Sequence, residues 1–462
     1  EICACLVGSE MCIRDRYKVV AMELYRSIIE DLKAWKRNSE RKPLILKGAR
    51  QTGKTWILEY FGRTEFKYTV KFNFDKDHSI HEIFETTKEP SRIISQLSLL
   101  TDSPILPSET LLIFDEIQEC NPALNALKYF YEDAPEYAVV AAGSLLGVAL
   151  SKGDSFPVGK VEFLNLYPLT FKEFLKTTNE KLYNYIEELT EITPLPQFVT
   201  DRLSELYQQY LVIGGMPAAI NYFLENKGME KVKKEQQIIL NAYTLDFSKH
   251  AENKDIPRII HIWNSIPSQL AKENRKFLYK LVKPGARARD YEDALLWLES
   301  AGLIYRVFCT TKPFLPLKAY DDLSAFKVYL SDVGLLRELS GLPSEIVFLG
   351  NDTYTEFKGA IAENYVLQSL VPQYDILPRY WTSVGKAEVD FVIQSGGEII
   401  PVEVKAQTQL GGKSLSVYDA NYHPTYKLRY SLNNLKQDGT LINIPLYLAD
   451  WTKKIVNFLI YR

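Results

Sequence analysis

The sequence has few cysteines, no long apolar run and no excess of basic charge. Its longest apolar candidate, residues 138–150, is interrupted by glycines and falls short of the roughly 18 residues that a membrane-spanning helix needs. The formal net charge of −3 provides no general attraction to nucleic acid. We therefore expect a soluble chain with no membrane partner, in which any contact with nucleic acid depends on a local patch.

Three of the five cysteines lie in the first 17 residues. This stretch has neither the basic start nor the long apolar centre of a secretory signal. It resembles translated sequencing-adapter read-through, so residues 1–21 are interpreted as a non-native extension before Met22. The remaining Cys120 and Cys309 are too few for a disulfide framework or a cysteine zinc site, which favours a reducing, cytoplasmic location.

Residues 42–61, KPLILKGARQTGKTWILEYF, contain the strongest motif. A short apolar run precedes G-x-x-x-x-G-K-T, and a helical pattern follows it, as a phosphate-binding loop requires. The alternative is an ordinary glycine turn. In the phosphate-binding interpretation Lys54 contacts the β- and γ-phosphates of ATP and Thr55 binds Mg²⁺. The predicted ATP-binding residues of this loop are Gly48, Ala49, Arg50, Gln51, Thr52, Gly53, Lys54 and Thr55.

Two further apolar strands end in polar residues. Residues 110–116 end in Asp115 and Glu116, and residues 136–144 end in Ser144. Strands of a parallel sheet present such residues at the carboxyl edge, where ligands bind. We expect Asp115 to hold Mg²⁺ and Glu116 to polarise the attacking water. Ser144 would reach the γ-phosphate if its strand lies between the other two, although a plain strand-end serine is an alternative.

Four stretches resemble the AAA-type P-loop ATPases of bacteria and archaea: GARQTGKT (48–55), LLIFDEIQE (111–119), AAGS (141–144) and YPLTFKEFL (167–175). The resemblance implies an α/β fold with an AAA-type parallel sheet, a helical and winged-helix middle, and a restriction-endonuclease-like α/β domain known as domain of unknown function 4143. The implied limits are 22–175 for the ATPase domain, 176–240 for a helical lid, 241–345 for the winged-helix region and 346–462 for the last domain.

The chain departs from that family at Lys160, where an arginine usually follows the glycine. Lysine lacks the planar fork of arginine, so Lys160 would be a poorer arginine finger, and activation by a neighbouring subunit is in doubt. The oligomeric state, including a homo-oligomer, stays open. Residues 275–311 resemble a winged helix, but acids on its second helix, Asp290 and Glu292 among them, count against DNA recognition.

Residues 387–407, AEVDFVIQSGGEIIPVEVKAQ, predict a hairpin. If Gly396 and Gly397 form a two-residue turn, residues pair when their numbers sum to 793. Asp390 would then face Glu403, and Glu388 would face Lys405, all on one solvated side. Asp followed by Glu-x-Lys resembles the restriction-endonuclease-like core, which often adds a helix glutamate, here Glu363. The implied catalytic set is Glu363, Asp390, Glu403 and Lys405, with Asp390 and Glu403 as metal ligands.

These patterns leave two functions open. In the first, ATP hydrolysis by Lys54 and Glu116, with Mg²⁺ on Thr55 and Asp115, drives or gates a nuclease-like domain that binds nucleic acid such as DNA. Whether that domain also cleaves it stays open. In the second, ATP switches the docking of a partner protein and the nuclease-like domain is an inactive platform. The pairing of Asp390 with Glu403 favours the first function, and the acidic winged helix favours the second.

Overall fold

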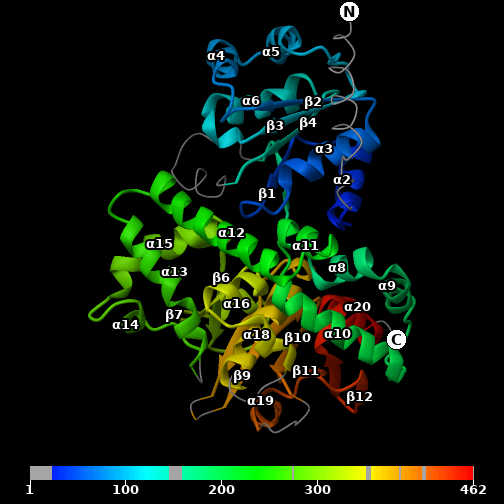
Figure 1. The fold of residues 1–462 in the computed structure, drawn as a ribbon, viewed down its shortest axis with the longest axis vertical. Coiled ribbons are helices and arrows are strands. Elements are labelled where there is room, and N and C mark those ends of the chain that lie inside the picture. The colour runs from blue at the N-terminus through cyan, green and yellow to red at the C-terminus, as the bar shows by residue number, and fades with distance from the viewer. Residues whose placement is uncertain are drawn as a thin grey trace, which may run out of the picture.

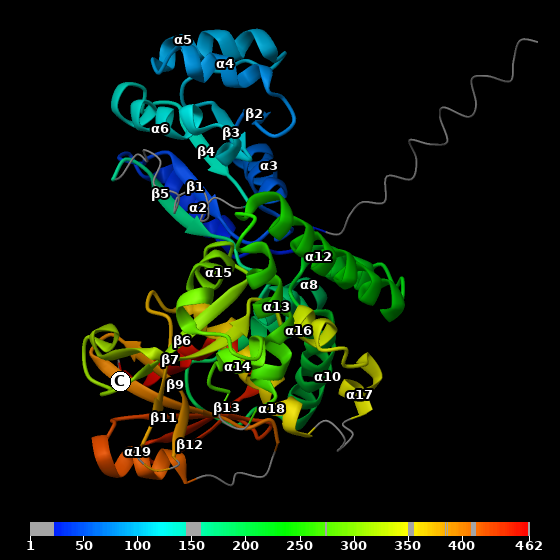
Figure 2. The same cartoon turned by 90° about the vertical axis from the view of Figure 1, so that its left-hand side faces the viewer.

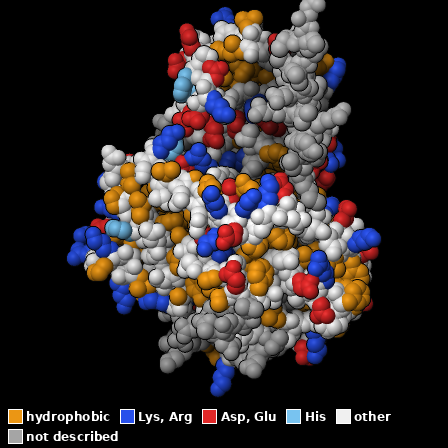
Figure 3. Space-filling model, viewed as in Figure 1, with side chains coloured by type: hydrophobic (Ala, Val, Ile, Leu, Met, Phe, Trp, Pro, Cys, Tyr) orange, Lys and Arg blue, Asp and Glu red, His pale blue; other side chains and the backbone are white. Residues whose placement is uncertain are grey.

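The computed structural model describes residues 23–144, 159–272, 275–349, 355–383, 385, 387–407 and 413–460. The predicted extension over residues 1–21 lies outside them. In Figures 1 and 2 a small lobe carrying β1 to β5 stands on a larger body, and α12 (Met229–His250) lies between the two. The space-filling view in Figure 3 shows the same narrow upper part on a broader lower part. Among the described residues, no helix combines the length and apolar character that crossing a membrane requires.

The small lobe is a parallel sheet of five strands in the order β2-β3-β4-β1-β5. Helices α4, α5 and α6 pack on one face, and α2 and α3 pack on the other. Burial on both faces explains why the central strands are apolar throughout. The elements are α2 (Ile28–Arg37), β1 (Leu44–Lys47), α3 (Lys54–Glu65), β2 (Tyr68–Asn73), α4 (Ser79–Thr86), α5 (Pro90–Leu97), η1 (Ser98–Leu100), β3 (Thr110–Asp115), η2 (Ile117–Glu119), α6 (Asn121–Asp133), β4 (Ala138–Ala142) and β5 (Glu162–Asn165).

A run of helices leads from this lobe into the larger body: α8 (Phe171–Thr178), α9 (Glu180–Glu187), α10 (Gln197–Ile213), α11 (Pro217–Leu224), α12 and α13 (Ile256–Leu270). The break predicted within residues 211–220 separates α10 from α11. At this break Gly214 has a φ of 73°, and a Cβ on it would lie 2.9 Å from the backbone of Gly334. A glycine is required there because two chain segments touch.

Residues 275–311 form helix, turn, helix and strand, as predicted, and α15 is followed by Gly302 with a φ of 72°. However, β6 (Ile304–Thr310) and β7 (Asp321–Leu330) are not a separate wing. They pair with each other, and β6 also pairs with β8 (Arg379–Thr382), in one mixed sheet of eight strands, β12-β13-β11-β10-β9-β8-β6-β7. The boundary predicted at residue 345 therefore separates no two sheets, and the helices and this sheet share one apolar core.

The remaining elements of the body, in chain order, are α14 (Tyr279–Val282), α15 (Ala288–Ser300), β6 (Ile304–Thr310), η3 (Leu317–Tyr320), β7 (Asp321–Leu330), α16 (Val333–Leu339), α17 (Ser344–Leu349), α18 (Thr355–Leu370), η5 (Val371–Gln373), β8 (Arg379–Thr382), β9 (Glu388–Ser395), β10 (Glu398–Val404), α19 (Ser414–Tyr422), β11 (Lys427–Ser431), β12 (Lys436–Asp438), β13 (Leu441–Pro445), η6 (Leu446–Trp451) and α20 (Thr452–Ile460).

Candidate functional site

The loop between β1 and α3 has the shape that its glycines predict. A Cβ on Gly48 would lie 2.3 Å from the carbonyl oxygen of Leu166, so only glycine fits. Gly53 has a φ of 90° and precedes the first residue of α3, while Gln51 is also left-handed at 67°. The Thr52 hydroxyl donates to the Ala49 carbonyl at 2.9 Å and closes the turn. The loop thus delivers its backbone to the amino end of a helix, where anions are stabilised.

Lys54 is buried inside this loop, with 6% of its surface exposed. Its ammonium donates to the carbonyls of Gly48 at 2.9 Å and Ala49 at 2.8 Å. Burial lowers the pKa of Lys54 to about 8, and the nearby charges of Glu116 and Asp115 act against that shift. Lys54 is a cation held by neutral oxygens, which a phosphate can replace.

Asp115 lies at the end of β3 beside the start of α3. Its carboxylate accepts hydrogen bonds from the Thr55 hydroxyl and the Asn73 amide, each at 3.1 Å. Burial raises the pKa of Asp115, the charge of Glu116 adds to the rise, and the two hydrogen bonds act against it. Carboxylate and hydroxyl oxygens side by side fit Mg²⁺. Asn73 was missed because nothing in its sequence context marks it.

Glu116 is held in a left-handed conformation, with a φ of 52°. It accepts hydrogen bonds from the Gln118 amide at 2.7 Å and from the Ser144 hydroxyl at 2.9 Å. Burial raises the pKa of Glu116, but these hydrogen bonds and the charge of Lys54 outweigh it, so the net shift is downward. Since β4 lies between β3 and β1, the condition set for Ser144 is met.

Two side chains from α12 hold the loop from the body side. Arg50 forms an ion pair with Asp246, and the Tyr243 hydroxyl donates to the Arg50 carbonyl at 3.0 Å. No local sequence pattern predicts this contact, because the partners are 193 and 196 residues apart. A cavity of about 420 Å³ also borders the loop; it includes Ser144 and is lined on the body side by Gly302 and Tyr305.

The hairpin turn is where the sequence placed it. Pairs run from Ser395 with Glu398 to Phe391 with Val402, and the residue numbers of each pair in this ladder sum to 793. The predicted alternation fails beyond that point, because β9 has a bulge between Val389 and Val392 against β8. Val389 consequently packs with Val392 in the cluster under α19, and Phe391 packs in the main core. Both faces of the hairpin are buried, so the predicted solvated face is wrong.

The predicted pairing of Glu388 with Lys405 is also wrong. Glu388 forms an ion pair with the fully buried Lys327 of β7. Glu363 on α18 forms another with Arg275 and accepts a hydrogen bond from the Tyr329 hydroxyl at 3.1 Å. Burial and, next, the charge of Asp390 raise the pKa of Glu363 to about 7.

The other two predicted residues have different partners. Glu403 is 2% exposed and lies 3.1 Å from the Lys405 ammonium and 3.3 Å from Arg429. Asp390 accepts a hydrogen bond from the backbone N–H of Val404 at 2.7 Å. Across the described ranges, no three His, Cys, Asp or Glu side chains are grouped to hold a metal ion.

Lys160, the residue at the predicted arginine-finger position, forms a 2.9 Å ion pair with Glu132 of α6 in the same chain. Its side chain is 37% exposed. It therefore lies on the surface of the small lobe.

Models of three protein families match the chain: an AAA domain over residues 40–175, domain of unknown function 8612 over 204–346 and domain of unknown function 4143 over 358–447. This is an AAA-type P-loop protein with a carboxy-terminal domain of unknown function 4143. Thr55, Asp115, Glu116 and Ser144, which are joined by hydrogen bonds, all lie in its AAA domain. No curated protein matches the chain.

Several solved structures resemble this AAA-type protein distantly. A Walker-type ATPase of Pyrococcus abyssi is 14% identical, with 69% of this chain and 96% of that one covered and a TM-score of 0.44. The Orc1 protein of Aeropyrum pernix in complex with DNA is 14% identical, with 70% and 92% covered and a TM-score of 0.26. PCH-2 of C. elegans is 15% identical, with 46% and 70% covered and a TM-score of 0.27.

Proposed function

We propose that the AAA domain binds and hydrolyses Mg-ATP. The observation that carries this proposal is the meeting of Lys54, at the start of α3, with Asp115 and Glu116, at the end of β3. Carbonyl oxygens bind Lys54, and neutral donors bind Asp115. Backbone amides and Lys54 would take the phosphates, and Thr55 and Asp115 would hold Mg²⁺. Bound Mg²⁺ supplies neutralisation of the charge that develops on the phosphate oxygens. Glu116, kept ionised by its hydrogen bonds, would orient the attacking water.

Two substitutions test the proposal. Lys54→Ala is expected to lose ATP binding, while Glu116→Gln binds ATP and turns it over at least about a hundredfold more slowly. Lys67→Ala and Glu109→Gln are matched controls, because these residues form an exposed ion pair in the same domain. ATP binding is measured by calorimetry and turnover by phosphate release. Normal turnover in both test variants would refute the proposal.

We infer further that the carboxy-terminal body is a platform for a partner protein, switched by ATP, rather than a nuclease. Glu363, Glu388 and Glu403 are each neutralised by an arginine or lysine of the chain itself. Carboxylates with such partners have little left to offer a divalent ion. The ion pair of Arg50 with Asp246 provides a route by which the nucleotide site and the body affect one another.

Incubation with single-stranded, duplex and branched DNA in Mg²⁺ or Mn²⁺ separates the two functions. We expect no cleavage. Cleavage that Asp390→Ala or Lys405→Ala abolishes would instead establish the nuclease that the sequence suggested. Size measurement with ADP and with a non-hydrolysable ATP analogue would show whether a partner here is a second copy of the chain.

A further inference from the structure

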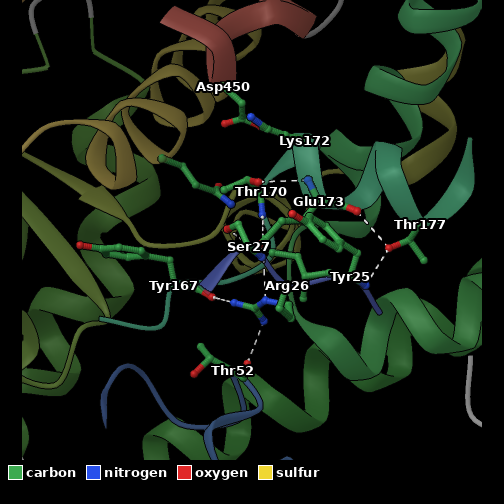
Figure 4. A network of polar contacts seen from close by, with 12 residues as sticks. Tyr25, Arg26, Ser27, Thr52, Tyr167, Thr170, Lys172, Glu173, Thr177 and Asp450 are labelled. Carbon is green, nitrogen blue, oxygen red and sulfur yellow. Dashed lines mark hydrogen bonds and ion pairs between the residues drawn. The ribbon is translucent and has the colours of Figure 1, made fainter. Parts of the chain in front are cut away.

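Arg26, just before α2, contacts the phosphate-binding loop from behind. It is 6% exposed and makes three contacts with two other segments, shown in Figure 4. One terminal nitrogen donates to the Thr52 carbonyl at 3.1 Å, and the other donates to the Tyr167 carbonyl at 2.6 Å. The Nε atom lies 3.5 Å from a carboxylate oxygen of Glu173. Nε makes no hydrogen bond with the described residues, so the two carbonyls and the nearby Glu173 charge offset the free energy that burying the guanidinium costs.

Glu173, the partner of Arg26, is itself fixed in place. It is 3% exposed and accepts hydrogen bonds from both the backbone N–H and the hydroxyl of Ser27, each at 2.7 Å. It also accepts from the N–H of Thr170 at 3.1 Å, while the Thr170 hydroxyl accepts from the N–H of Glu173 at 3.2 Å. This reciprocal cap starts α8 and leaves the carboxylate with a single orientation.

The first turn of α8 is also attached to the carboxy-terminal body. The backbone N–H of Lys172 donates to Asp450 at 2.7 Å, and Asp450 is 7% exposed on η6. The Lys172 ammonium lies 2.6 Å from Glu187, which accepts a hydrogen bond from the Trp451 indole at 2.8 Å. Figure 4 shows Asp450, Lys172, Glu173 and Arg26 following one another from the body to the loop. The first turn of α8 thus contacts both η6 and Arg26, the residue that binds the Thr52 carbonyl.

We propose that Arg26 is a positioning residue of the phosphate-binding loop, and that Glu173 makes this positioning depend on the contact between α8 and η6. A trans peptide is planar, so holding the carbonyl of Thr52 on Arg26 aims the N–H of Gly53 the opposite way. The inference rests on the proposed ATPase function, in which that N–H faces a phosphate. A purely structural ion pair between Arg26 and Glu173 is the alternative.

The Arg26→Lys variant distinguishes positioning of the loop from a purely structural ion pair. Lysine keeps the positive charge beside Glu173 but lacks the fork that reaches both carbonyls. Positioning predicts about tenfold or greater losses in ADP affinity and in kcat/KM for ATP, with a melting temperature close to that of the wild type. It also predicts faster amide hydrogen exchange at Gly53 and Lys54 without nucleotide. Unchanged exchange and an unchanged ADP affinity, with or without a lower melting temperature, would overturn the proposal.

The second part concerns Asp450. Asp450→Asn keeps the shape of the side chain and weakens the acceptor, so we expect a smaller loss in kcat/KM that is not additive with that of Arg26→Lys. Asn434→Ala is the control, because Asn434 joins the body to Leu195 at 2.7 Å without touching α8. Its effect should add to that of Arg26→Lys. Additive effects of Asp450→Asn would overturn the dependence on η6.

Failure of the proposed function is distinguishable from failure of this inference. If the wild-type chain neither binds ADP nor hydrolyses ATP, the ATPase proposal fails. The exchange rates of Gly53 and Lys54 in Arg26→Lys still decide whether Arg26 holds the loop.

Discussion

Two groups of acids, one in the AAA domain and one in the body, are neutralised differently. In the AAA domain Asp115 and Glu116 accept hydrogen bonds from neutral side chains of Thr55, Asn73, Gln118 and Ser144. In the body Glu363 and Glu388 form ion pairs with Arg275 and Lys327. Neutral donors hold a carboxylate in place while its charge stays available to a cation. A direct ion pair neutralises that charge. The acids of the AAA domain are therefore arranged to bind a ligand, and those of the body are arranged to stabilise the fold.

The segments that supply the partners strengthen this comparison. Arg275 precedes α14 and Lys327 lies on β7, whereas Glu363 and Glu388 lie on α18 and β9. The two ion pairs therefore join the middle of the chain to its last domain. We expect their loss to be felt in folding, and the loss of contacts at Asp115 to be felt in nucleotide turnover.

The largest effect should follow from Lys327→Met, which removes the fully buried cation beside the partly buried Glu388. Breaking a buried pair in this way costs about 3–5 kcal/mol of unfolding free energy. Urea denaturation at pH 8 would measure it, and the loss should shrink at pH 5.5, where Glu388 can take up a proton. Lys67→Met, which breaks an exposed pair, is the control and is expected to cost little, because water screens such pairs. Equal losses in the two variants would remove the contrast between the regions.

The next effect concerns the pH dependence of stability. The pKa of Glu363 in the folded chain is about 7, raised first by burial and then by Asp390, while Arg275 and Lys327 act against the rise and Glu388 adds to it. The native state then binds more protons than the unfolded state between about pH 4.5 and 7, so stability falls as pH rises through that window. The fall attributable to Glu363 should be roughly 3 kcal/mol.

Glu363→Gln keeps the shape of the side chain and removes its titration. The difference between its unfolding free energy and that of the wild type is followed from pH 4.5 to 8. This difference isolates the titration of Glu363 from that of other acids whose pKa is raised, such as Asp450. A variant that loses stability in parallel with the wild type over this range would show that Glu363 does not carry the proton.

These two regions also show how much of the structure can be predicted from the sequence. The glycine-rich loop, the strand-end acids and the position of Ser144 follow from local patterns, and all of them meet in the fold. At the hairpin, the turn and register were predictable from Gly396 and Gly397. The partners of Glu388 were not, since the bulge in β9 depends on how β8 pairs with it and Lys327 is 61 residues away.

A third effect tests the first region through pH. The pKa of Lys54 is lowered by burial to about 8, so its ammonium loses its proton as pH rises above that value. ATP needs the charged form, and ATP affinity should fall by about tenfold per pH unit above pH 8 until the pH reaches the higher pKa of the bound lysine. Titration calorimetry at pH 7, 8 and 9 would measure this. Lys54→Arg, charged throughout, should bind ATP with a flat profile; a flat wild-type profile would mean that Lys54 carries no charge of importance to ATP.

The smallest effect belongs to Asn73, which donates one of the neutral hydrogen bonds to Asp115. Removing it in Asn73→Ala leaves the carboxylate with the Thr55 hydroxyl as its side-chain donor and lets burial raise the pKa of Asp115 further. One such hydrogen bond is worth about 1 kcal/mol, so the Mg²⁺ concentration for half-maximal turnover should rise about fivefold, and more below pH 6 than at pH 8. A lysine at position 73 would neutralise part of the Asp115 charge that is otherwise available to Mg²⁺. Asn73→Lys should therefore weaken Mg²⁺ binding more than Asn73→Ala does. Equal behaviour of the alanine and lysine variants would show that neutral and charged donors are interchangeable beside Asp115, and that the contrast between the two acid groups has another cause.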